Sequence, residues 1–292
     1  MAHDSQNVRI WPAGTISAQT PPVFRLSLPR LPTAGNGPGR ITLTAKTPDG
    51  QNMVFVHSSG IFLWNSRSAN DLIPVTPPVG WGPDSGSASN TGARTVATSA
   101  EPILPHFRAV QVAPNAQRIY LLEQSQGRGG RLHAWAITRP SPSSPAQAVD
   151  LNWDIPLGEG VIGIALRNDG ALLAVGDSTG GVTLVDILTQ RIVAKIPPLN
   201  QDSDNFTLAM AFSPDGQNMA IGSPEGTISL WSVGQPKKPR LLFHLPGHRG
   251  VIFSLAYDPQ NRRLASAGSD PLVEVWDLEL LQRELMRLGL AN

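Results

Sequence analysis

The feature that most constrains this chain is a repeat of about 45 residues. Three stretches align with one another, at 161–186, 207–232 and 251–277. Each holds an alternating strand, a turn of the Pro-Asp-Gly kind, an apolar strand, a second turn and a third strand. Their closing positions, Val185, Trp231 and Trp276, lie 46 and then 45 residues apart. A fixed period in this range predicts a repeat architecture.

Two weaker copies lie upstream, at 41–65 ending in Trp64 and at 107–136 ending in Trp135. The strands follow at short intervals with no helical pattern between them, which excludes a fold of alternating strands and helices. About four strands per unit predict a blade of a β-propeller, because a single blade buries its apolar faces only by stacking on other blades. With 28 glycines and 27 prolines, the composition suits many short turns.

The last repeat, "GHRGVIFSLAYDPQNRRLASAGSDPLVEVWD" at 247–277, opens with Gly-His and closes with Trp-Asp. On these residues it resembles a WD repeat. The resemblance implies an all-β propeller of four-stranded blades with a buried structural tetrad, formed here by His248, Ser266, Asp270 and Trp276. In such a tetrad the histidine bridges the acid and the hydroxyl, and the hydroxyl meets the indole N–H, so every buried polar group has a partner.

The other copies depart from this pattern. The repeat at 207–232 keeps Trp231 but has Ile221 at the serine position and Glu225 at the aspartate position. The repeat at 161–186 has Val185 in place of the tryptophan, and the two upstream copies keep only the tryptophan. The resemblance therefore extends over most of the chain but is specific only in the last repeat.

The predicted layout is a single WD-repeat propeller over 1–292 with five recognisable repeats. It comprises a half-blade at 1–30, blades at 41–76, 106–156, 160–197, 206–245 and 247–277, and a closing helix at 278–290. Two Gly/Ser/Pro-rich segments, 77–102 and 138–148, are predicted to be surface loops.

The tail is predicted to be an amphipathic helix, because leucines recur at helical spacing at 278, 281, 285 and 288. Asp277 is placed to cap its start and Gly289 to end it, and Glu279 and Arg283 are spaced for an ion pair. The tail resembles the closing helix of some bacterial multidomain WD-repeat proteins. Some of these carry a kinase, but this chain has no kinase motif.

The opening stretch predicts an incomplete ring. Residues 5–11 align with the third strand of a blade and 23–28 with a fourth, whereas residues 1–4 are too few for a first and a second. The last blade also lacks a fourth strand, because a helix follows Trp276. We expect the C-terminal part of a larger, seven-bladed propeller. The alternative is a five-bladed ring that residues 23–28 close. An incomplete ring favours self-association or a completing chain.

Two groups of residues resemble catalytic motifs. The segment "GDSTGG" at 176–181 matches a nucleophile elbow around Ser178, but strands on both sides predict a turn instead. The Ser266, His248 and Asp270 set has the composition of a hydrolase triad, yet the tetrad would bury it. The six histidines lack metal-ligand spacing. The sequence therefore predicts no catalytic residue, no metal site and no cofactor.

The leading functional hypothesis is a non-catalytic scaffold that binds a protein or peptide. Phe107, Asn205 and Arg249 are the candidate surface residues. The basic segment "PKKPR" at 236–240 is interpreted as a solvated loop, with an anionic partner as the alternative. A second hypothesis is a lactonase-like or quinoprotein-like hydrolase or oxidoreductase with a channel site, although the sequence shows no ring of inward acids for one. A third is a partial propeller that has no separate function until it is completed.

Charge and composition limit the partners and the compartment. The formal net charge of +1 gives no field that favours nucleic acid or an anionic membrane. The chain has no cysteine, which fits a reducing compartment, and it shows no secretory signal pattern and no apolar run long enough to span a bilayer. The sequence therefore predicts a cytoplasmic protein with neither a nucleic-acid nor a membrane partner.

Overall fold

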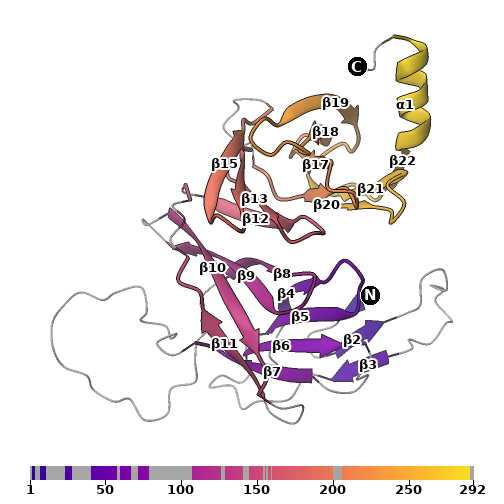
Figure 1. Cartoon of the computed structure of the whole chain (residues 1–292). Coiled ribbons are helices and arrows are strands. Elements are labelled where there is room, and N and C mark those ends of the chain that lie inside the picture. The colour runs from indigo at the N-terminus through magenta and orange to yellow at the C-terminus, as the bar shows by residue number, and fades with distance from the viewer. Residues whose placement is uncertain are drawn as a thin grey trace. The chain divides into compact units, whose positions relative to one another are not determined.

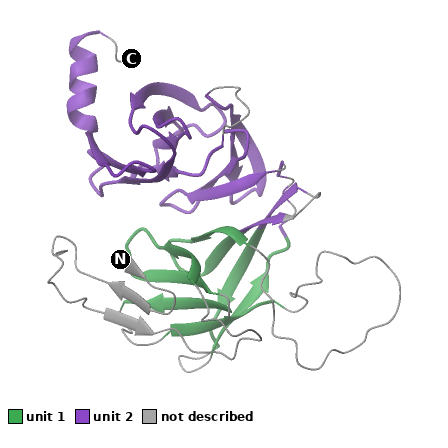
Figure 2. Cartoon of the chain, turned by 180° about the vertical axis from the view of Figure 1, so that it is seen from behind, with its two compact units in different colours: residues 1–121, 133–152 green, residues 122–132, 153–292 purple. Residues whose placement is uncertain are grey.

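The computed structural model describes residues 41–57, 60–66, 72–78, 107–125, 129–140, 145–153, 155, 157–158, 160–199 and 206–289, and the backbone of three strands before residue 28. The chain divides into two compact units (Figure 2). Unit 1 holds residues 1–121 and 133–152, and unit 2 holds residues 122–132 and 153–292.

Two antiparallel four-stranded sheets lie mostly in unit 1. The first has β4 (Ile41–Lys46), β5 (Asn52–His57), β6 (Gly60–Asn65) and β7 (Leu72–Thr76). The second has β8 (Phe107–Val112), β9 (Arg118–Ser125), β10 (Gly129–Thr138) and β11 (Ala146–Asp150). The outer strands β7 and β11 pair in parallel, which joins both into one eight-stranded sheet. The repeats at 41–65 and 107–136 predict two separate blades here. The pairing of β7 with β11 was not predicted, because aligned repeats give no information on which outer strands pair.

The core of unit 1 is shared by the inward faces of these strands. It gathers Val54 and Ile61 from the first sheet with Ile119, Leu121 and Trp135 from the second, each at most 1% exposed. Alternate residues of a strand point to opposite faces, so each strand contributes every second side chain to this core. Burying one such side chain contributes about 1.5–3 kcal/mol to the free energy of unfolding.

Three short strands precede this sheet, β1 (Ala2–His3), β2 (Asn7–Ile10) and β3 (Phe24–Ser27). They form an antiparallel sheet in that order. The strands predicted at 5–11 and 23–28 correspond to β2 and β3. Residues 1–4 are expected to be too few for a first and a second strand, and the structure forms one two-residue strand there, β1, which pairs with β2 through Ala2↔Arg9 and His3↔Val8.

Unit 2 contains two four-stranded blades and one three-stranded blade (Figure 1). The first is β12 (Val161–Leu166), β13 (Leu172–Asp177), β14 (Val182–Asp186) and β15 (Arg191–Ile196). The second is β16 (Met210–Phe212), β17 (Asn218–Gly222), β18 (Thr227–Ser232) and β19 (Arg240–Pro246). The third is β20 (Ile252–Tyr257), β21 (Arg263–Gly268) and β22 (Val273–Asp277). The predicted all-β class, with four-stranded blades of the propeller type, is confirmed.

Apolar side chains fill the two interfaces between neighbouring blades of unit 2. Between the first two, Leu184 packs with Met219 and Val233. Between the second and the last, Ile228 packs with Leu264. All five are fully shielded from solvent. The facing sheets of neighbouring blades therefore bury apolar side chains against each other, as the repeat predicts, whereas Val273 and Val275 on β22 of the last blade are exposed.

The turn after the first strand of each repeat is built alike. A backbone N–H at the fourth position donates to the carbonyl three residues earlier in all five repeats. That fourth residue has a positive φ each time, at Gly50, Ala116, Gly170, Gly216 and Asn261. Glycine adopts this conformation without strain and asparagine tolerates it, whereas alanine is strained in it. The Pro-Asp-Gly pattern seen in the sequence is thus a conformational requirement.

Ala116 is the exception, because its φ is 55°. Replacing it with glycine, Ala116→Gly, is expected to raise the free energy of unfolding by about 1 kcal/mol through relief of that strain. Urea denaturation followed by tryptophan fluorescence measures the change. Gly50→Ala, at the equivalent turn of the preceding repeat, is the reverse control and should lower stability by a similar amount. A destabilised Ala116→Gly would contradict the proposed strain.

The C-terminal helix α1 (Leu278–Arg287) begins where the sequence predicts. Asp277 caps it by accepting a hydrogen bond from the Leu280 N–H at 2.8 Å, and Gly289 follows with a φ of 68°. The expected ion pair between Glu279 and Arg283 is wrong. Arg283 donates to the Glu279 carbonyl oxygen instead, because the Glu279 carboxylate faces Arg262 in the adjacent turn, with 3.9 Å between the charged groups.

Candidate protein-interaction site

A buried hydrogen-bonded group centres on His248 at the start of the last blade. Its Nδ1 pairs with Asp270 Oδ1 at 2.7 Å and its Nε2 pairs with Ser266 Oγ at 3.0 Å. The histidine side chain is 0% exposed. The backbone N–H of Arg249 donates to the other Asp270 oxygen at 3.0 Å. The structure thus brings together three of the four predicted tetrad residues.

Trp276 is not part of this group, so the expected bond between its indole and Ser266 is wrong. The indole nitrogen is shielded from solvent and has no hydrogen-bond partner among the described residues. Ser266 lies opposite Glu274 in the strand register, whereas Trp276 lies opposite Leu264. Ser266 and Trp276 are therefore diagonal neighbours and not a directly opposed pair.

In the preceding blade, the buried indole N–H has an acceptor, which is a residue that the sequence analysis missed. Trp231 Nε1 donates to Ser229 Oγ at 3.0 Å, and both side chains are buried. Ser229 lies two residues before the tryptophan on the same strand, so both side chains point to one face. The two-residue spacing between Ser229 and Trp231 is present in the sequence, but the family pattern places the tetrad serine at position 221, which is isoleucine here.

Glu274 occupies the position equivalent to Ser229 in the last blade. Its Oε2 atom is shielded and, within the described chain, has no hydrogen-bond partner. We expect Glu274→Ser to raise the free energy of unfolding by about 1 kcal/mol, because it removes a carboxylate oxygen without a partner and supplies an acceptor for the indole. In a Trp276→Phe background the gain should shrink, which a double-mutant cycle in urea measures. A gain of equal size in both backgrounds would refute the serine–indole bond.

The environment of Asp270 favours its charged form. The Arg249 N–H and the His248 side chain lower the pKa of this carboxyl below its usual value, although partial burial opposes the shift. A lowered native pKa means that Asp270 stabilises the fold above the unfolded-state pKa of about 3.9 and loses this contribution as the pH falls through the lower native value.

We therefore expect Asp270→Asn to be less stable than the wild type at neutral pH. The difference in free energy of unfolding should shrink as the pH falls below about 4, because the carboxyl is protonated first in the unfolded state and only at lower pH in the native state. Urea denaturation of both proteins at neutral and acid pH measures it. A difference that does not depend on pH would contradict the stabilising role of the charge.

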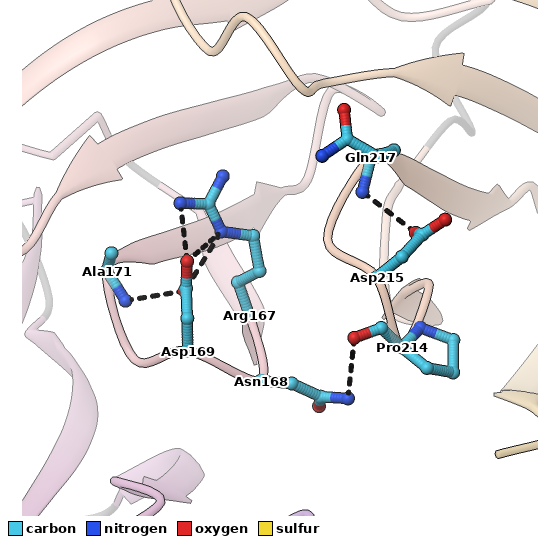
Figure 3. Close-up of polar contacts among 7 residues, drawn as sticks. All are labelled: Arg167, Asn168, Asp169, Ala171, Pro214, Asp215 and Gln217. Atoms are coloured by element: carbon cyan, nitrogen blue, oxygen red, sulfur yellow. Dashed lines mark hydrogen bonds and ion pairs between the residues drawn. The ribbon is translucent and has the colours of Figure 1, made fainter.

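Polar side chains link the equivalent turns of the first two blades of unit 2 (Figure 3). Arg167 donates to both oxygens of Asp169 at 2.9 and 3.0 Å, while Asn168 Nδ2 donates to the Pro214 carbonyl oxygen at 3.4 Å. Burial raises the pKa of the Asp169 carboxyl, but the hydrogen bonds from Arg167 and the Ala171 N–H together outweigh it, so the pKa lies below its usual value.

The link continues to the last blade. Asn261 Nδ2 donates to Asp215 Oδ2 at 2.8 Å, and the other Asp215 oxygen accepts the Gln217 N–H at 3.0 Å. Three turns, at residues 167–170, 213–217 and 258–261, are thus joined by side-chain hydrogen bonds. We call this set of residues the linked turns. It presents charged and amide groups in fixed positions, which suits recognition of a protein surface.

The predicted surface residues fall in different environments. Arg249 is exposed. Phe107 does not suit a surface role, because it is 9% exposed. Its ring packs edge-on against Trp135 in the core of unit 1, with 6.3 Å between the ring centroids. As the first inward residue of β8, it belongs to the alternation that builds this core. Asn205 lies outside the described residues.

Ser178 lies in a hairpin turn between β13 and β14, as predicted. Asp177 Oδ1 accepts hydrogen bonds from the Thr179 and Gly181 N–H groups at 2.8 and 3.0 Å, which commits this carboxylate to the turn. Among the described residues no group of three or more acids and histidines is placed to hold a metal ion. In that same part of the chain, no helix has the length and apolar character needed to cross a membrane.

Comparison with known proteins identifies the repeats. The family model for the WD domain, G-beta repeat, matches residues 201–232 and 239–277. WD repeat-containing protein VIP3 of Arabidopsis thaliana is 33% identical over 118 residues, which is 37% of this chain and 36% of that protein. U3 small nucleolar RNA-associated protein 7 of Saccharomyces cerevisiae is 32% identical over 107 residues, 37% of this chain and 18% of that protein.

A third relative, WD repeat-containing protein 1 of Bos taurus, is 30% identical over 115 residues, 39% of this chain and 18% of that protein. The chain therefore spans little more than a third of these relatives at most. The stacked blades and the buried histidine group define a repeat protein of the β-propeller class. The family match identifies WD repeats in the segments 201–232 and 239–277, which include the second and last blades of unit 2.

Proposed function

We propose that this chain is a non-catalytic protein-interaction scaffold of the cytoplasm, and that the linked turns bind a protein or peptide partner. The observation that supports it is the side-chain bonding between three successive turns, through Asn168 to Pro214 and Asn261 to Asp215. A surface fixed before binding loses little conformational entropy on association, which favours affinity.

The charges of the linked turns suit selective rather than general binding. The Arg167 side chain is 16% exposed and already paired with Asp169, which is 55% exposed. Arg167 therefore holds the Asp169 carboxylate in a fixed position, and its own charge is already paired and not available to a phosphate group. This pairing and the net charge of +1 support our proposal that neither nucleic acid nor a membrane is the partner.

The absence of catalysis is part of the proposal. Ser266 is 1% exposed, and the His248 side chain that faces it is fully buried, so a substrate has no access to this Ser-His-Asp set. Ser178 lies in a hairpin whose neighbouring carboxylate is already engaged. A fluorophosphonate probe should label neither serine, and labelling lost in Ser178→Ala or Ser266→Ala would contradict a non-catalytic role.

The partner proposal is tested by quantitative affinity capture from a lysate of the native host. Asn168→Glu and Gln217→Lys alter the linked turns, and Ser178→Glu alters an exposed turn between β13 and β14 as the matched control. We expect a defined set of proteins that both linked-turn variants lose and the control keeps. Capture that is equal for all four proteins would contradict the proposal. The same captures show whether a second copy or a completing chain is among the partners.

A further inference from the structure

A pocket of about 630 Å³ lies within unit 2 between the second blade, the last blade and α1. Residues 240–243 of β19 form one wall, and Leu278 and Leu285 of α1 form another. Tyr257 and the turn at Asn261 and Arg262 complete the lining. The volume is that of a site for several side chains or a small ligand. It is distinct from the buried His248 group.

Two polar atoms in the pocket lining have no hydrogen-bond partner among the described residues. They are the Tyr257 hydroxyl oxygen and Asn261 Oδ1, and both are shielded from solvent. The Asn261 amide nitrogen is held by Asp215, which fixes the side chain. Burial raises the pKa of Tyr257, with the charge of Asp215 adding to the shift, so its hydroxyl remains a donor at neutral pH. The residues that line the pocket thus hold one donor and one acceptor that have no partner in the described chain.

The wall at β19 is a strand edge. β19 is the last strand in its sheet, so no described strand pairs with its outer side. Leu241 and Leu242 on this strand are each 37% exposed. An extended peptide adds to such an edge through backbone hydrogen bonds while its alternate side chains enter the adjacent pocket. A peptide therefore fits this pocket better than a compact small molecule does.

The charge around the pocket selects the peptide. Arg240 and Arg262 line it against one acidic residue, Glu279, and Arg262 is 68% exposed. Lys237 and Lys238 are exposed just before β19, so the basic segment at 236–240 leads directly into the pocket wall. This position beside the pocket supports the alternative interpretation of residues 236–240, in which the segment binds an anionic partner. Basic rims attract acidic groups and steer their approach.

We propose that this groove between β19 and α1 binds an extended peptide of a partner protein, with an apolar centre flanked by acidic residues. The inference rests on the proposed scaffold function and names a second contact for it. The apolar side chains enter between Leu241 and Leu285, the peptide backbone pairs with β19, and the acidic flanks face Arg240 and Arg262.

The test uses three fluorescein-labelled nonapeptides with one Leu-Val-Leu core, flanked by glutamates, by serines or by lysines. Fluorescence anisotropy of the full chain should show the order glutamate, serine, lysine in affinity, with the difference reduced by salt. Arg240→Glu should weaken the glutamate peptide about tenfold or more, and Tyr257→Phe roughly threefold to tenfold. Arg191→Glu is the matched control, because Arg191 begins β15 as Arg240 begins β19, and it should leave affinity unchanged.

Three results would overturn the proposal. One is equal binding of all peptides, and another is binding that Arg240→Glu and Tyr257→Phe leave intact. The third is no peptide binding alongside sedimentation with phosphatidylserine vesicles that Arg240→Glu abolishes, which would assign the groove to anionic lipid. Because the peptides are synthetic, their failure leaves the capture by the linked turns unaffected, so the two proposals fail separately.

Discussion

Replacing Gly226 with alanine should strongly lower the free energy of unfolding. A Cβ at this position would lie 1.7 Å from the His248 carbonyl oxygen and 2.5 Å from its carbon. The Gly226 carbonyl also accepts the N–H groups of Gly247 and His248 at 3.0 and 2.9 Å, so the two segments cannot separate without losing both bonds. We expect a loss of about 3 kcal/mol or more.

The control for Gly226→Ala is Gly50→Ala. Both glycines have a positive φ, of 86° and 68°, but a Cβ at Gly50 meets nothing within 4 Å. Gly50→Ala should therefore cost only about 1 kcal/mol of backbone strain. Urea denaturation of both variants compares the loss from backbone strain alone, at Gly50, with the loss from strain and steric overlap together, at Gly226. Similar losses for the two would contradict the close approach of His248.

His248→Ala should also be strongly destabilising. It leaves Ser266 and Asp270 without their shared partner and opens a cavity where a fully buried ring stood. The expected loss in free energy of unfolding is about 2–4 kcal/mol. His244→Ala is the control, because His244 is exposed on β19, and it should change stability by less than about 0.5 kcal/mol. An unchanged melting curve for His248→Ala would refute a structural role for the group.

The strands and turns were predictable because they depend on local pattern. Alternating side chains mark β12 to β14, and Asp277 marks the start of α1, since each property is set by neighbours along the chain. The positive φ at Gly50 and Gly216 follows from the turn residues themselves. The pairing of His248 with Asp270 and Ser266 was accessible through the family pattern, which records long-range contacts that one sequence does not.

The features that the sequence did not predict depend on register and on packing between distant segments. The parallel pairing of β7 with β11 joins two outer edges that no local pattern relates. The bond between Trp231 and Ser229, and the isolated indole of Trp276, depend on which residues face each other across strands. The same holds for the linked turns, where Asn168 and Asn261 reach turns 46 positions away.

Site-specific photocross-linking in the native host tests the scaffold proposal most directly. A benzoylphenylalanine placed at Asn168 or Gln217 samples the linked turns, and one placed at Ser178 samples the matched control turn. We predict that both linked-turn positions cross-link to the same protein and that the control position does not. Cross-links that are absent at Asn168 and Gln217, or equally strong at Ser178, would contradict the proposal that the linked turns bind a protein partner.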